Sequence, residues 1–211
     1  MVSTGPRGPA AIERIDTQVA RLFALVSEGL AGATSALLSH DRAEAERLVA
    51  RDEVVDRLSR EVEDLVREQL DLELARPQLV YLVTVLQILP ELERSADLAE
   101  HIAQRAGHGL GVDMTPRSRG IVQRMAEVGL EMWQLVADAY AERAPDAWGD
   151  LDEADEELDA LHTSLTAEVA RGTMAVGVAT EVTLIARFYE RLGDHAVNLA
   201  RRITRLASGQ I

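Results

Sequence analysis

Four pairs of acidic residues, each pair spaced four positions apart, are the side chains in this sequence best suited to chemistry. The pairs are Asp52 with Asp56, Glu93 with Asp97, Asp155 with Asp159, and Glu190 with Asp194. On an α-helix, residues i and i+4 lie on one face, where two like charges repel each other by about 0.2–0.5 kcal/mol. Such repeated pairing needs compensation, which either a bound cation or nearby arginines can supply.

The available donor atoms favour a hard metal ion at these pairs. The chain has no cysteine, so every metal ligand must be an oxygen or an imidazole nitrogen. Carboxylate oxygens suit Mg²⁺ or Mn²⁺, and Fe or Zn²⁺ where open positions allow. The competing interpretation is that the acids only form salt bridges with arginines such as Arg57, Arg94 and Arg191. In a chain with 36 acidic residues, a single such pair carries little information. Because the pairs recur in both halves, we predict metal binding.

Two histidines stand close to the acidic pairs. His162 follows Asp159 by three residues, and His195 directly follows Asp194, so either imidazole can in principle join a site. A lone histidine is more often solvated or hydrogen-bonded within the protein. The sequence has no Glu-x-x-His motif, no phosphate-binding glycine loop, and no G-x-S-x-G or H-E-x-x-H motif. We therefore assign no catalytic or cofactor-binding residue and predict that the protein is not an enzyme. A carboxylate-bridged metalloenzyme remains the alternative from that class.

The elements that must position the acids are helices. Apolar residues make up 47% of the chain and aromatic residues only 3%, a composition that favours long helices over sheets. Apolar residues recur at spacings of three and four, which predicts helices through residues 15–26, 55–65, 81–102, 121–139, 151–165 and 175–206. Pro77 suits the first turn of the third helix. A further break is expected around residues 144–149, and the glycine-rich segment 107–116 is the expected boundary between halves.

The two halves of the chain resemble each other. ERSADLAEHIA from Glu93 aligns with ERLGDHAVNLA from Glu190 at an offset of 97 residues, and the two share Glu, Arg, Asp and two Ala. DEVVDRL from Asp52 aligns with DEELDAL from Asp155 at an offset of 103. An internal duplication explains both alignments. The predicted fold is all-α, with two tandem three-helix bundles over residues 10–108 and 113–208.

Antiparallel pairing of the helices would bring the acids of each repeat together. Pairing Asp56 with Glu93 puts the connecting turn next to Ala75 and Pro77, where proline independently predicts a helix start. Pairing Asp155 with Glu190 puts the second turn next to Gly172. Each repeat is therefore expected to hold two acidic pairs at the same level of neighbouring helices, at the edge of the core.

The segment FYERLGDHAVNLARRI at residues 188–203 resembles the signature of the PhoU family of phosphate-signalling proteins. The resemblance extends over nearly the whole chain and includes the family's E(D)xxxD metal motifs at all four acidic pairs. The first copy departs from the pattern, because Ser95 and Ala96 replace the Leu-Gly pair, Leu98 replaces the histidine, and His101 replaces the asparagine. The second copy is therefore the better metal candidate.

The resemblance implies a regulatory role rather than catalysis. It implies a negative regulator of phosphate uptake and of phosphate-responsive two-component signalling. Its partners would be a sensor histidine kinase and the ATPase of a phosphate ABC transporter. It also implies metal clusters on the acidic motifs and a homodimer. The alternative function is a metal-free helical adaptor or chaperone-like binding module, whose acids only keep the surface charged.

The charge of the chain bears on where it acts. The formal net charge is −14, so the long-range field repels nucleic-acid phosphates, and we predict no nucleic-acid partner. The first ten residues lack the apolar core of a signal peptide, and the uncharged apolar stretch at residues 79–89 is too short to span a bilayer. We expect a cytoplasmic protein without direct membrane insertion.

Overall fold

The computed structural model describes residues 8–144 and 149–209, except for the side chains of Asp52 and Asp150. These residues form helices and connecting loops, and no strand occurs in the described ranges. The predicted all-α class is therefore confirmed. The helices are α1 (Pro9–Ser39), α2 (Arg42–Val49), α3 (Asp52–Leu70), α4 (Arg76–Gly107), α5 (Leu110–Asp113), α6 (Pro116–Glu142), α7 (Gly149–Ala170) and α8 (Val176–Ala207).

The helix ends follow from local sequence. Pro77 lies in the first turn of α4, as predicted, where its missing N–H costs no hydrogen bond. Thr115 caps α6 by accepting a hydrogen bond from the Ser118 N–H at 3.1 Å. Gly172 adopts a positive φ of 71° in the α7–α8 loop, so the second predicted turn is where glycine indicated it.

The six long helices correspond to the six predicted ones. The short helices α2 and α5 are additions: α2 lies before α3, and α5 lies within the segment 107–116 that was expected to be the boundary between the halves. The break expected around residues 144–149 falls largely outside the described residues. The domain limits 10–108 and 113–208 stay a prediction.

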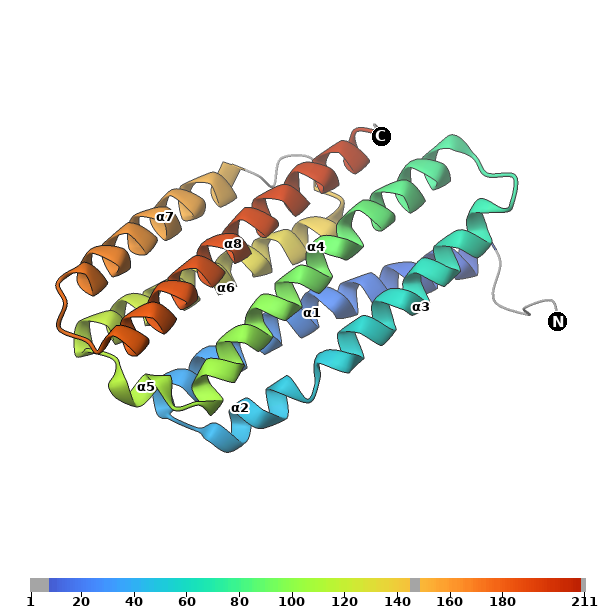
Figure 1. The fold of residues 1–211 in the computed structure, drawn as a ribbon. Coiled ribbons are helices and arrows are strands. Elements are labelled where there is room, and N and C mark those ends of the chain that lie inside the picture. The colour runs from blue at the N-terminus through green and yellow to red at the C-terminus, as the bar shows by residue number, and fades with distance from the viewer. Residues whose placement is uncertain (1–7, 145–148, 210–211) are drawn as a thin grey trace.

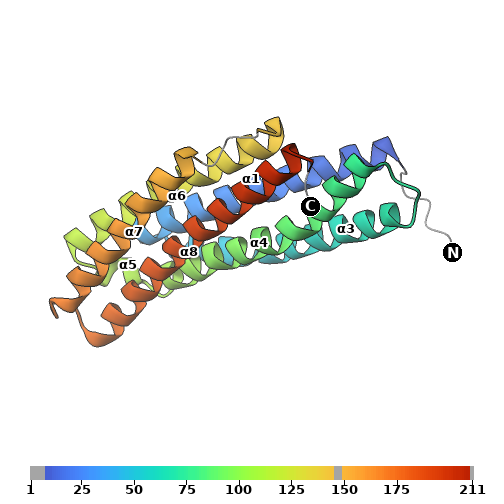
Figure 2. The ribbon, with the colours of Figure 1, turned by 90° about the horizontal axis from the view of Figure 1, so that it is seen from above.

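The long helices form an elongated bundle of two three-helix units (Figure 1). The first unit contains α1, α3 and α4, and the second contains α6, α7 and α8. Helices α4 and α8 pack against each other in the middle of the molecule, and α1 packs against α6. Seen from above, α3 and α7 lie at opposite ends of the assembly (Figure 2). Each packs mainly against the two other long helices of its own unit.

One hydrophobic core runs through both units. Its largest fully buried side chains include Phe23 on α1, Trp133 and Tyr140 on α6, and Tyr189 on α8. The Phe23 and Trp133 ring centroids are 6.2 Å apart, and the Trp133 indole N–H donates to the Leu192 carbonyl at 3.2 Å. These contacts fix α8 against α6 and α1, and so fix one wall of the second acidic region.

Helix α1 is long and apolar enough to span a membrane by those two criteria alone, with a mean hydropathy of 1.4 over its most apolar window. Many of its apolar residues, among them Ile15, Leu22 and Leu30, are fully buried in the core. A core helix passes the same test, and burial of the apolar face by α4 and α6 accounts for its composition.

Candidate metal sites

The structure places the predicted acids at two edges of the bundle. The first acidic cluster lies between α3 and α4, and the second lies between α7 and α8. Asp52 begins α3, but its side chain lies outside the described part of the structure. The first cluster is therefore defined by Asp56, Glu93 and Asp97, and the second by Asp155, Asp159, Glu190 and Asp194.

The second cluster combines burial with repulsion among its carboxylates. Burial, and after it the negative charges of Asp159, Asp194, Asp152 and Glu190, together raise the pKa of Asp155 from 3.8 to about 6. Burial also raises the pKa of Glu190, against the opposing effects of the nearby Arg187 guanidinium and of His162. The four predicted carboxylates of this cluster therefore repel one another, and the nearby positive charges offset this repulsion only in part.

A glycine brings the two helices of the second cluster close together. A Cβ atom at Gly193 would lie 2.6 Å from Leu158 Cδ2 and 3.1 Å from Asp155 Oδ1. Asp155 and Leu158 therefore occupy space that any other residue at position 193 would fill. This close approach directs Asp155 toward α8, which carries Glu190 and Asp194.

The first cluster has a different lining. Burial raises the pKa of Glu93; the Ser59 hydroxyl opposes the rise, while the charges of Asp56, Glu63 and Asp97 add to it. Ser59 is fully buried, and within the described residues its Oγ has no hydrogen bond of normal geometry. A fully buried hydroxyl without such a bond, beside three or more carboxylates, is the arrangement that an added cation or water would satisfy.

Sequence analysis missed three members of these clusters. Ser59 and Glu63 follow Asp56 by three and seven residues and so lie on the same face of α3, while Asp152 lies one turn before Asp155 on α7. Extending the i+3 and i+7 periodicity from each acidic pair would have found them.

Arginines compensate the acids only in part. Arg187 forms an ion pair with Glu190, whereas Arg94 approaches Glu91 at 3.9 Å rather than a member of the first cluster. Within the described ranges, neither Arg57 nor Arg191 forms an ion pair. The salt bridges that the competing interpretation expects from Arg57, Arg94 and Arg191 to the acidic pairs are therefore not present there.

The metal sites are not preassembled. Among the described residues, no three histidine, aspartate or glutamate side chains converge closely enough to hold a metal ion. The donor set, the Ser59 hydroxyl without a hydrogen bond of normal geometry and the close approach of Asp155 to α8 at Gly193 nevertheless fit a divalent cation. The first cluster's Asp56, Glu93 and Asp97 and the second cluster's four acids are the residues that would hold it.

His195 does not face the second cluster. Its Nδ1 lies 2.9 Å from the Ser95 hydroxyl of α4, and its Nε2 lies 3.8 Å from Glu91, which also accepts from Arg202 at 3.3 Å. Burial lowers the pKa of His195 and favours the neutral imidazole. This histidine therefore joins α8 to α4 across the boundary between the repeats.

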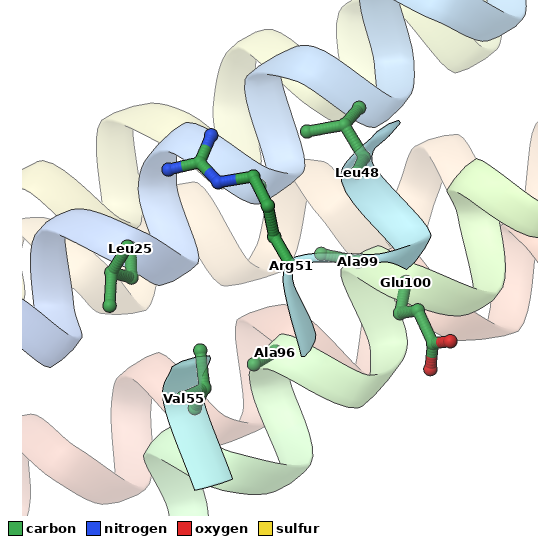
Figure 3. Close-up of a pocket in the computed structure, with 8 residues that line it drawn as sticks. Leu25, Leu48, Arg51, Val55, Ala96, Ala99 and Glu100 are labelled. Atoms are coloured by element: carbon green, nitrogen blue, oxygen red, sulfur yellow. The ribbon is translucent and has the colours of Figure 1, made fainter. Parts of the chain in front are cut away.

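A small pocket adjoins the first repeat (Figure 3). Apolar side chains of α1, α2, α3 and α4 line it, and Arg51 and Glu100 stand at its edge. Ala96, one of the lining residues, occupies the position that Gly193 occupies in the second repeat at the offset of 97. The two repeats thus differ in how their second and third long helices meet.

Comparison with known proteins identifies the duplicated unit. A family profile described as the PhoU domain matches residues 19–106 and again residues 122–203. The chain is 29% identical to the phosphate-specific transport system accessory protein PhoU homolog of Rhizobium meliloti, over 94% of this chain and 86% of that protein. It is 31% identical to PhoU homolog 2 of Mycobacterium bovis, over 86% of this chain and 89% of the relative.

Solved structures show the same fold. The crystal structure of PhoU from Pseudomonas aeruginosa superposes with a TM-score of 0.88 at 23% identity, covering 95% of this chain and 99% of that one. The phosphate transport system regulatory protein PhoU from Streptococcus pneumoniae gives 0.83 at 20% identity, covering 94% and 96%. Because the profile matches both halves and covers most of the chain, this protein belongs to the PhoU family.

Proposed function

We propose that this chain is an accessory protein of phosphate transport that represses phosphate uptake and phosphate-responsive two-component signalling. The observation that carries the proposal is the match of the PhoU domain to both repeats, together with relatives described as accessory proteins of the phosphate-specific transport system. The protein acts in the cytoplasm by binding the transporter ATPase and a sensor histidine kinase, and it functions as a homodimer. It turns over no substrate.

Metal binding is the second part of the proposal. The carboxylates of each cluster lie on two different helices, so one cation bound by both would tether α3 to α4 or α7 to α8. Bound metal supplies positive charge that offsets the repulsion raising the pKa values of Glu93, Asp155 and Glu190. Mg²⁺, Mn²⁺, Fe or Zn²⁺ would thereby set the shape of the faces that α3 and α7 present to a partner.

The regulatory role is tested by deleting the gene and restoring it. Deletion is expected to derepress phosphate uptake and alkaline phosphatase at high phosphate, and a plasmid copy is expected to restore repression. Uptake and phosphatase activity that stay repressed after deletion would overturn the assignment and favour the adaptor alternative.

Metal binding is tested on protein purified without chelator. We expect elemental analysis to find metal in the wild type and less of it in the double variant Glu190→Ala, Asp194→Ala. The matched control is Glu127→Ala, Glu131→Ala, which removes an exposed i, i+4 acidic pair from α6. Equal metal content in all three proteins would contradict metal binding by the second cluster.

A metal-free adaptor is the second candidate. The observation favouring it is that the described carboxylates are not gathered at ligand distances. This candidate predicts wild-type protein without metal, and phosphate uptake and alkaline phosphatase activity that do not change when the gene is deleted.

A further inference from the structure

The two acidic clusters have carboxylates at equivalent positions of the two repeats. They differ at one further position, whose side chain supplies a different donor atom in each repeat. At the offset of 103 residues that aligns α3 with α7, Ser59 corresponds to His162. In the first cluster, the Ser59 hydroxyl opposes the rise in the pKa of Glu93. In the second cluster, the charge of His162 opposes the rise in the pKa of Glu190. The duplication therefore places a hydroxyl beside the glutamate of one cluster and an imidazole beside the glutamate of the other.

The spacing of His162 on α7 suits metal binding. Asp155, Asp159 and His162 follow one another at intervals of four and three residues, so all three lie on one face of the helix. The contacts of Asp155 and Leu158 with the Gly193 position show that this face meets α8. A carboxylate and a histidine three residues apart on one face form the i, i+3 arrangement that holds metals in carboxylate-bridged helical bundles.

His162 resembles the inner carboxylates of the second cluster in its burial. It is half-buried, as are Asp155 and Glu190, whereas Asp159 and Asp194 are exposed. Within the described residues, the imidazole makes no hydrogen bond or ion pair. Its nitrogen is therefore available to a cation that draws the surrounding carboxylates together.

We propose that His162 is a direct ligand of the metal in the second cluster, which makes that site a mixed oxygen and nitrogen site, while the first is all-oxygen. This inference rests on the proposed metal binding. An imidazole ligand favours Zn²⁺, Mn²⁺ or Fe²⁺ over Mg²⁺, whereas an all-oxygen site accommodates Mg²⁺ well. The two repeats of one chain then differ in their metal preference.

The test exchanges the two residues that distinguish the clusters. Full-length protein, freed of metal and reloaded with Mn²⁺, is examined by electron spin echo envelope modulation, which detects ¹⁴N bound to the ion. We expect one imidazole nitrogen signal in the wild type, no signal in His162→Ser, and a second coupled nitrogen in Ser59→His. The control is His108→Ser, which removes an exposed histidine beyond the end of α4 and should leave the signal unchanged.

Affinity measurements complete the test. His162→Ser is expected to lower Zn²⁺ affinity of the second site by about tenfold or more, with Mg²⁺ affinity little changed. Circular dichroism checks that the variant folds, and His162→Gln serves as a second variant if the serine variant does not. Bound Mn²⁺ without a nitrogen signal in the wild type, or a signal that persists in His162→Ser, would overturn the inference while leaving metal binding intact. If neither cluster binds Mn²⁺ or Zn²⁺, both the proposed metal binding and the role of His162 are overturned.

Discussion

The two acidic clusters differ less in their acids than in what surrounds them. Glu93 and Asp97 correspond to Glu190 and Asp194, yet the residue three positions before the glutamate is Pro90 in one repeat and Arg187 in the other. Pro90 lies within α4 and carries no charge, while Arg187 pairs with Glu190. The two repeats have therefore kept the same carboxylates, but the residues around these carboxylates differ.

The third long helix is also held differently in the two repeats. In the second repeat, Trp133 of α6 is fully buried and donates a hydrogen bond to the Leu192 carbonyl, next to Gly193. At the offset of 103, the corresponding residue of α1 is Leu30, which is equally buried but has no polar atom. The second unit therefore has a hydrogen-bonding anchor between its first and third long helices that Leu30 does not provide in the first unit.

Removing this anchor is expected to have the largest effect. Trp133→Ala should destabilise the protein by about 3–5 kcal/mol, because it empties a large core volume and leaves the Leu192 carbonyl without its indole donor. Urea denaturation followed by circular dichroism measures the loss. Leu30→Ala, at about 2–5 kcal/mol, is the matched change in the first repeat. Metal titrations should show a larger loss of binding at the second cluster in Trp133→Ala than in Leu30→Ala. Equal losses of metal affinity at both clusters in both variants would show that Trp133 has no special role in the second cluster.

A smaller effect is expected from closing the gap between α7 and α8. The methyl group of Gly193→Ala would lie 2.6 Å from the Cδ2 of Leu158, which is fully buried and has little room to turn. Overpacking of this kind costs about 1–3 kcal/mol, and the better helix propensity of alanine offsets about 0.5–1 kcal/mol of it. We expect the variant to be less stable and to lose metal affinity at the second cluster only.

The matched control is another glycine of the same helix. A Cβ at Gly177 would meet nothing within 4 Å, so Gly177→Ala should be neutral or slightly stabilising. The thermal midpoints of both variants, with and without metal, make the comparison. Gly193→Ala behaving like Gly177→Ala would mean that the close approach of the helices does not matter to the second cluster.

The helical periodicity and the repeat were accessible from the sequence because each rests on local patterns. The seam through Val182, Ile185 and Tyr189 is buried as predicted, and Pro77 and Gly172 mark the turns where they were expected. The acidic pairs were found for the same reason, since i, i+4 spacing fixes which residues share a helix face.

Contacts between helices were not accessible in this way. Sequence spacing left open whether His195 faces the second cluster, but the side chain turns across the boundary of the repeats to Ser95. The close approach at Gly193 and the ion pair that Arg187 forms depend on side-chain packing rather than on periodicity. The acidic residues could be predicted, whereas the residues that tune them required three-dimensional neighbours.

The smallest effect concerns pH in the chelator-treated protein. The pKa of Asp155 is about 6 in the folded state against 3.8 ordinarily, so between these values the folded state binds more protons than the unfolded state. Stability should therefore fall as pH rises toward 6 and level off above about 7. Because Asp155 is partly exposed, the slope stays well below the roughly 1.4 kcal/mol per pH unit of one fully released proton.

Thermal midpoints of the wild type and Asp155→Asn from pH 5 to 7.5 test this pH dependence of stability. We expect the variant to lose part of the slope and to be the more stable protein at pH 7.5, and metal to reverse that order. Parallel pH profiles for the two proteins would show that repulsion in the second cluster does not limit the stability of the metal-free protein.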